Sequence, residues 1–252
     1  GRMNMQLKAL WSLYRRQLST TVFYPPILVF TMFLPIMLFF MFGAFQAYSD
    51  NPAGDGNYAA KAMIGMCVYG AGMASATIGA QVGVERAQGW TRQLALTPVE
   101  PVTNFVNKLL LSITSALFSI LAVLAVGCAT TAEGPARMWA LSPILTLLGS
   151  LSTAAMGIMV GYLLRSDGAY GVILGGFAIL AFFGDNFIPL DSMPSFFRDV
   201  APFTPLYGIT MIARWPLLQG AFEWTWAAGV AAWTVIFGIV SVRRMRTDTA
   251  RR

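Results

Sequence analysis

The sequence predicts an all-α integral membrane protein with six transmembrane helices and with both termini in the cytoplasm. Hydrophobic residues make up 56% of the 252 residues and charged residues 11%, whereas a soluble domain has about 25% charged residues. Six apolar runs approach the length of roughly 20 residues that a helix needs to cross a bilayer. These runs use most of the chain, so we expect one membrane domain over residues 1–252, without a catalytic centre of its own.

Residues 4–20 are expected to form an amphipathic helix that lies in the headgroup layer. Apolar residues recur at helical spacing on one face, and Arg15 and Arg16 contribute to a basic face. Trp11 and Tyr14 lie at the border between the faces, where aromatic rings favour the membrane surface. An ordinary solvated leader is the alternative. We take Met3 as the native start and expect no cleavable signal peptide.

The six predicted spans follow the apolar runs at residues 22–45, 58–84, 102–128, 139–164, 170–183 and 224–242. The first run is rich in Phe and Met and contains Pro25, Pro26 and Pro35. Proline is tolerated in the first turn of a helix, but inside a helix it removes a hydrogen bond. We therefore expect the first span to kink at Pro35.

Small residues spaced four apart in the spans allow neighbouring helices to approach closely. Such pairs are Gly79 with Gly83, Gly157 with Gly161, and Gly171 with Gly175. Contacts within one subunit are the first interpretation, and a seam between two subunits is the alternative. Cys67 and Cys128 both lie in apolar runs, where free thiols are expected to be buried as small hydrophobic groups.

The distribution of positive charge determines the predicted orientation. With the N-terminus inside, four basic residues fall outside, namely Lys61, Arg137, Arg198 and Arg214. Thirteen fall on the cytoplasmic side, namely Arg2, Lys8, Arg15, Arg16, Arg86, Arg92, Lys108, Arg165, Arg243, Arg244, Arg246, Arg251 and Arg252. This asymmetry follows the positive-inside rule. The net charge of +6 therefore reflects topology, and nucleic acid is not an expected partner.

The middle of each predicted span lacks Asp, Glu, Lys and Arg, and the sequence has no His. Lys61 and Lys108 lie within a turn or two of span ends, where a Lys side chain can reach the interface. Ion-coupled transporters place ionisable groups inside the membrane, so an ion-coupled mechanism is not favoured. The same absence argues against an intramembrane enzyme and against a metal site.

Residues 85–101 join the second and third predicted spans on the cytoplasmic side, and we expect them to dock a partner protein. Gly89 breaks the helix, a short helix is predicted over 91–96, and prolines end it. The connection is longer than the 2–8 residues that typically join helices, although a simple turn is the alternative. The expected docking residues are Glu85, Arg86, Gly89, Trp90, Thr91, Leu94, Leu96, Thr97 and Pro98.

This loop resembles the one after the second span of ABC-2 permeases, the type V exporter-like membrane subunits of drug and lipid exporters. The family pattern is Glu-Arg-x-x-Gly-Thr-x-Glu-x-Leu-x-x-Thr-Pro-Val. The matching residues here are Glu85, Arg86, Gly89, Leu94, Thr97, Pro98 and Val99. Trp90 is inserted before Thr91, and Gln93 stands where the family often has an acid. The difference at Gln93 argues against a specific ion pair at that position, but not against docking.

Residues 187–207 resemble the family's outer segment, in which short re-entrant helices follow the fifth span. The residues that carry this prediction are Pro189, Pro194, Phe196, Phe197, Pro202 and Pro205. The prolines exclude one continuous helix, and the two Phe residues are too apolar for a solvated loop. Irregular backbone at membrane depth requires cover from protein or from a water-filled cavity.

The resemblance implies a permease subunit that moves a lipophilic or amphipathic cargo (a drug, a lipid or a lipid-linked glycan) outward through the bacterial plasma membrane. It also implies two copies of an ATP-binding cassette ATPase as partners, and a second or related permease, in contact with membrane lipids. The sequence has no Gly-x-x-x-x-Gly-Lys-Ser/Thr motif, so ATP and Mg²⁺ are expected in the partner. An ATP-independent channel or scaffold subunit is the alternative function.

Overall fold

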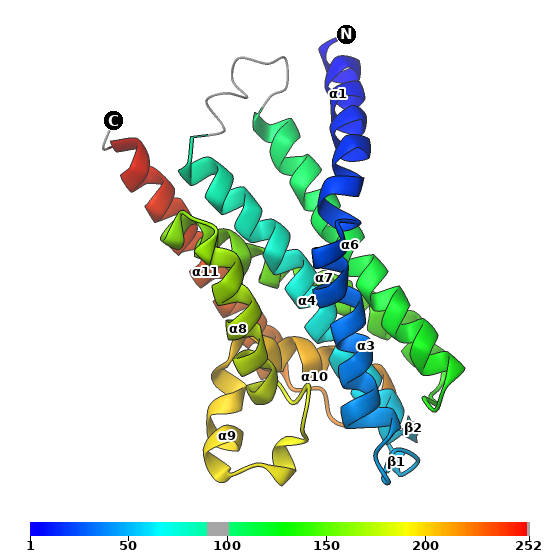
Figure 1. Ribbon diagram of the computed structural model, residues 1–252. Helices are drawn as coiled ribbons and strands as arrows, with labels where there is room; N and C mark the ends of the chain where they lie inside the picture. The colour runs from blue at the N-terminus through cyan, green and yellow to red at the C-terminus, as the bar shows by residue number, and fades with distance from the viewer. Residues whose placement is uncertain (90–100, 251–252) are drawn as a thin grey trace.

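The computed structural model describes residues 1–89 and 101–250, which are mostly helical (Figure 1). Among these described residues, five helical segments are long and apolar enough to cross a membrane. They are Pro25–Ala44, α4 (Tyr58–Ala87), α6 (Pro101–Ala129), α7 (Ala136–Leu164) and a segment of α11 (Trp224–Ala250). The fifth predicted span corresponds to α8 (Gly168–Phe183), an apolar helix of 16 residues. At 1.5 Å per residue it is about 24 Å long, shorter than the hydrocarbon core of about 30 Å.

Residues 18–44, which include Pro25–Ala44 and are called the first long segment below, alternate between α-helical and π-helical turns. After α1 (Arg2–Gln17) the order is η1 (Leu18–Val22), α2 (Pro25–Leu28), η2 (Val29–Phe33), α3 (Leu34–Phe39) and η3 (Phe40–Ala44). Tyr24 is extended, with φ −66° and ψ 124°, as is favoured before a proline. The pyrrolidine nitrogens of Pro25 and Pro26 cannot donate, so the α-helical ladder is interrupted there. Pro35 lies in the first turn of α3, so the kink expected there stays a prediction, and the π-helical turns were not predicted.

Short elements gather at the end of the bundle opposite the start of α1 (Figure 1). Strands β1 (Pro52–Ala53) and β2 (Gly56–Asn57) pair antiparallel, with Pro52 opposite Asn57 and Ala53 opposite Gly56. After α8 come η4 (Leu190–Ser192), α9 (Ser195–Val200), η5 (Ala201–Phe203) and α10 (Pro205–Leu218). Pro194 and Pro205 stand at the starts of α9 and α10, where a missing N–H costs no helical hydrogen bond.

Helix α4 lies in the middle of the bundle and supplies most of the core. It packs on α6, α7, α8, α10 and the first long segment, and most of its side chains are buried. Gly79 and Gly83 lie against the backbone of α7, and Gly157 and Gly161 lie against the backbone of α4. These glycines therefore make contacts within one subunit, whereas Gly171 has open space around its Cα atom.

The cysteines differ in environment. Cys67, in α4, is buried as expected, but Cys128, near the end of α6, is exposed. The expectation that both thiols are buried was therefore wrong for Cys128. An apolar run marks contact with lipid as readily as contact with protein, so it does not determine burial within the subunit.

Candidate functional site

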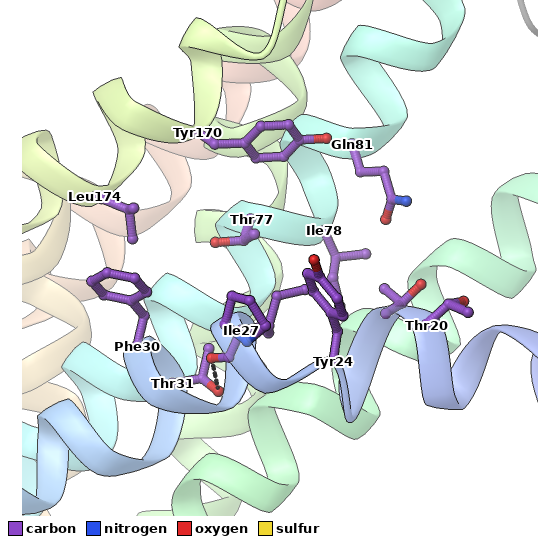
Figure 2. A pocket seen from close by; sticks show the side chains of 12 residues that line it. Thr20, Tyr24, Ile27, Phe30, Thr31, Thr77, Ile78, Gln81, Tyr170 and Leu174 are labelled. Carbon is purple, nitrogen blue, oxygen red and sulfur yellow. Dashed lines mark hydrogen bonds between the residues drawn. The ribbon is translucent and has the colours of Figure 1, made fainter.

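A cavity of about 370 Å³ lies between the first long segment, α4 and α8 (Figure 2). Its lining residues are Thr20, Thr21, Tyr24, Pro26, Ile27, Phe30, Thr31, Thr77, Ile78, Gln81, Tyr170 and Leu174. The volume is within the range of sites that bind small molecules, about 300–1,000 Å³. No charged side chain stands among the described residues that line it, so the cavity suits an uncharged or weakly polar molecule.

The irregular backbone of the first long segment shapes one wall of this cavity. The lining residues between Thr20 and Thr31 belong to η1, the break at Tyr24, α2 and η2. π-helical turns inside α-helices often occur at functional sites. The hydroxyl of Thr31 donates to the carbonyl of Ile27 at 2.8 Å (Figure 2), and Thr77 does the same to Met73 at 2.8 Å. The hydroxyl protons of both threonines are therefore engaged by carbonyl groups four residues earlier in the chain.

The lining of the cavity offers polar groups at a few points. Figure 2 shows the ring of Tyr170 extending from α8 toward Gln81 on α4, and Tyr24 on the first segment. Phe30 and Leu174 face one another at the apolar end (Figure 2). A mostly apolar lining with a few polar groups is the usual composition of a ligand site. Sequence analysis did not predict this cavity, because its lining is drawn from three segments that are distant in the sequence.

The segment predicted to dock a partner is described at both of its flanks. Helix α4 ends at Ala87, and Gly89 has a φ of +85°, a conformation that glycine adopts without strain. The N–H of Gln88 donates to the carbonyl of Val84 at 2.9 Å, and Arg165 donates from Nη2 to the carbonyl of Ala87 at 3.2 Å. The end of α4, where the predicted docking segment begins, is therefore held in place. The predicted residues Trp90, Thr91, Leu94, Leu96, Thr97 and Pro98 lie outside the described residues.

Glu85 and Arg86, at the same end of α4, face different neighbours. Glu85 forms an ion pair with Lys108, with 3.4 Å between Oε1 and Nζ, and the Lys108 side chain is 4% exposed. The sequence suggested that Lys108 could extend toward the interface, but it turns inward to Glu85. The Nη1 of Arg86 donates to the hydroxyl of Tyr162 at 3.4 Å. Its guanidinium carbon lies 6.0 Å from the ring centre of Phe105.

Helix α1 packs along the first half of α6 through polar contacts. The hydroxyls of Tyr14 and Thr114 are 2.7 Å apart, and Asn107 donates to the side chain of Gln17 at 2.8 Å. Trp11 is exposed and stacks on Tyr14, with ring centres 6.2 Å apart. Arg15 and Arg16, near the end of α1, are also exposed. The location of α1 in the headgroup layer stays a prediction, whereas its contact with α6 was missed by the sequence analysis.

A buried polar cluster connects α10 to the beginning of α4. Arg214 is 2% exposed, its Nε donates to the carbonyl of Lys61 at 3.0 Å, and its Nη1 lies 3.5 Å from Oδ1 of Asp185. Asn186 donates to the carbonyl of Gly65 at 2.9 Å and to Thr210 at 3.0 Å. The guanidinium of Arg214 lies where a Cβ atom at position 65 would be, so only glycine allows this approach. From the sequence, Arg214 was expected to be a basic residue on the outer side of the membrane, and the buried cluster was not predicted.

The residues predicted for the outer segment lie at the start of short elements or on aromatic contacts. Pro189 and Pro194 precede η4 and α9, while Pro202 belongs to η5 and Pro205 begins α10. Phe197 stacks on Phe183 of α8, with 4.9 Å between ring centres, and Phe196 contacts the same ring at 6.1 Å. The aromatic contacts hold α9 against the end of α8.

Comparison with known proteins identifies the family. A family model described as "ABC-2 family transporter protein" matches residues 50–242, which is well over half of the chain. The chain belongs to the ABC-2 transporter family. The resemblance seen in the loop after α4 is thereby confirmed at the level of the family.

One relative of this ABC-2 protein is named "Putative transport permease YvfS", from Bacillus subtilis (strain 168). The two are 23% identical over 201 residues, which cover 79% of this chain and 80% of the relative. The region matched by the ABC-2 family model contains the α4 and α8 walls of the cavity, the buried polar cluster around Arg214 and both flanks of the predicted docking segment. The first wall of the cavity, Thr20–Thr31, precedes that region.

Proposed function

We propose that the chain is the membrane subunit of an ATP-driven exporter, and that it moves a lipophilic or amphipathic cargo outward. The cavity carries this proposal, because its apolar lining and its few uncharged polar groups match the chemistry of such a cargo. The cavity is lined by Thr77, Ile78 and Gln81 of α4, and the same helix leads on to the segment 85–101. A cargo site and a docking segment on one helix are the parts that a coupled permease requires.

The topology we propose has six crossings, with α8 as the fifth. In Figure 1, helix α8 begins partway along the bundle and runs to the end where α9 and α10 lie. The start of α1 and the last described turns of α11 then lie at the same end, as an even number of crossings requires. The charge distribution places that end in the cytoplasm, and the short helices around 187–207 on the outer side of a bacterial plasma membrane.

The energy for transport would come from a partner. The sequence has no phosphate-binding loop, and a member of the ABC-2 family is in general paired with an ATP-binding cassette ATPase. We propose an assembly of two such ATPases with two permeases, either identical or related. ATP and Mg²⁺ would bind in the ATPases, and their closure would push on the segment 85–101 and on α1. Rigid-body movement of the spans would then change access to the cavity.

Blocking the cavity tests this function. Leu174 lines the cavity on α8, whereas Ile179, on the same helix, is 62% exposed. Leu174→Trp should abolish export by the reconstituted permease–ATPase complex and should remove the stimulation of ATP hydrolysis by cargo. Ile179→Trp, the matched control, should retain both.

Two outcomes would contradict the proposal. Full cargo-stimulated hydrolysis in Leu174→Trp, at matched abundance, would exclude this cavity as the cargo site. Cargo flux through the permease alone, without an ATPase or ATP, would support an ATP-independent channel instead.

A further inference from the structure

A second cavity, of about 240 Å³, lies at the docking-segment end of the bundle, over the face of α7 that is flanked by α6 and α11. Its lining residues are drawn from α4, α6, α7 and α11, and it shares none with the cavity described above. Helix α11 packs on α7 and α10, and many of its apolar side chains are exposed. This second cavity is therefore a groove on the outside of the subunit, beside a helix that presents an apolar surface.

The groove has two chemically different parts. Val82, Phe105 and Ile158 form an apolar part, which continues as a narrow space between α4, α6 and α7. Arg86 and Tyr162 form a polar part at the level where α4 ends. This arrangement of a cationic group above an apolar slot matches a molecule with an anionic head and a hydrocarbon tail.

Within the part of the chain that the structure describes, no negative charge matches the positive charge in the groove. The described contacts of Arg86 are the Tyr162 hydroxyl at 3.4 Å, the sulfur of Met245 at 3.6 Å and the ring of Phe105. None of these partners is an acid, and no carboxylate stands among the described residues that line the groove. The end of α11 also carries Arg243 and Arg244, which are not among the lining residues of the groove.

We propose that this groove binds an anionic glycerophospholipid of the cytoplasmic leaflet. The phosphate accepts hydrogen bonds from Arg86 and Tyr162, and an acyl chain lies along Val82, Phe105 and Ile158. A guanidinium is well suited to this contact, because its planar donors match phosphate oxygens. The assignment of this lipid to the cytoplasmic leaflet rests on the topology given under the proposed function. The groove itself does not depend on that topology. The bound lipid would fill the space between α6 and α11, which no described side chain fills.

Native mass spectrometry of the full-length permease, without its ATPase, tests this site. The detergent-solubilised protein is titrated with phosphatidylglycerol and with phosphatidylcholine of identical acyl chains. We expect phosphatidylglycerol to bind at least about fivefold more tightly, the factor that corresponds to about 1 kcal/mol per basic residue near an anionic lipid. Arg86→Gln should lose that preference, while its binding of phosphatidylcholine should be unchanged.

A pair of glycine variants on α11 assigns the binding to the groove. Gly238 lines the groove, and a Cβ atom there would meet nothing within 4 Å. Gly238→Leu should therefore fold and should obstruct the slot, weakening the binding of both lipids several-fold. Gly229 also has open space around it but lies outside the groove, so Gly229→Leu is the matched control and should bind as the wild type does.

Two results would overturn the proposal. Equal affinity of the wild type for the two lipids would remove the anionic recognition, and wild-type binding by Gly238→Leu would place the lipid elsewhere. If Arg86→Gln does not fold, Tyr162→Phe serves in its place, because it removes one of the two donors. These measurements require neither ATP nor transport, so a failure here is distinguishable from a failure of the proposed export function.

Discussion

The ion pair between Arg214 and Asp185 offers a quantitative test of the buried polar cluster. The Arg214 side chain is 2% exposed and that of Asp185 is 13% exposed. Asp185 also has a φ of +63°, a conformation that Asn tolerates and most other residues do not. Asp185→Asn therefore removes the negative charge with little change in shape or backbone strain. Arg214 would keep its hydrogen bond to the carbonyl of Lys61 but would lose its counter-charge.

The expected cost follows from the burial of the remaining charge. Removing one partner of a buried ion pair typically costs about 3–5 kcal/mol, because the other charge stays buried without compensation. Since Asn retains an oxygen that can face the guanidinium, we expect the lower end, about 3 kcal/mol. Arg214→Met in the Asp185→Asn background should cost less than Arg214→Met alone, because the two residues are energetically coupled.

An exposed ion pair at the same end of the molecule supplies the control. Arg137 and Asp55 form an ion pair in which the side chains are 39% and 55% exposed. Asp55→Asn should cost about 0–1 kcal/mol, as is usual for surface pairs. The free energy of unfolding is measured by denaturant titration in mixed micelles, with tryptophan fluorescence as the signal. If Asp185→Asn were no more destabilising than Asp55→Asn, the buried pair would not stabilise the contact between α10 and α4.

Three further predictions concern topology, energy source and coupling. In a cysteine-free background, a cysteine at Ala53 should react with an impermeant reagent in sealed cells and one at Trp90 should not; reaction at Trp90 would refute six crossings. Dissipating the proton gradient at constant ATP should leave export within about twofold, because the spans offer no central carboxylate or His; loss of export would indicate ion coupling. Leu94→Asp with Leu96→Asp should insert normally but lose ATPase co-purification or at least tenfold of transport, since interface cores exclude charge; wild-type behaviour would exclude the coupling role.

The long helices could be predicted from the sequence because an apolar run of bilayer length is a strong signal. Helix α4 (Tyr58–Ala87) and α7 (Ala136–Leu164) begin and end within three residues of the predicted spans 58–84 and 139–164. Helix α11 continues beyond the predicted end at 242 and reaches Ala250. The apolar run ends there because charged residues follow, but Arg and Met are good helix formers, so the helix itself does not end.

The contacts of polar residues could not be predicted, because they depend on neighbours that are distant in the sequence. Lys108 pairs with Glu85 across two helices, and Arg214 reaches the carbonyl of Lys61 from 153 residues away. The cavity likewise combines residues from Thr20 to Leu174. Residue type and spacing indicate which segments cross the membrane, but they do not indicate which faces of those segments meet.

The composition of α4 explains how one helix can connect the cavity to the predicted docking segment. Of the five described span candidates it has the lowest mean hydropathy and the highest burial, because it contacts protein instead of lipid and need not be strongly apolar. Small residues such as Gly79 and Gly83 let it lie directly on the backbone of α7. A helix packed this closely cannot bend freely at one end. A push on the segment after Ala87 would therefore move α4 as a unit and displace Gln81, two turns away, in the wall of the cavity.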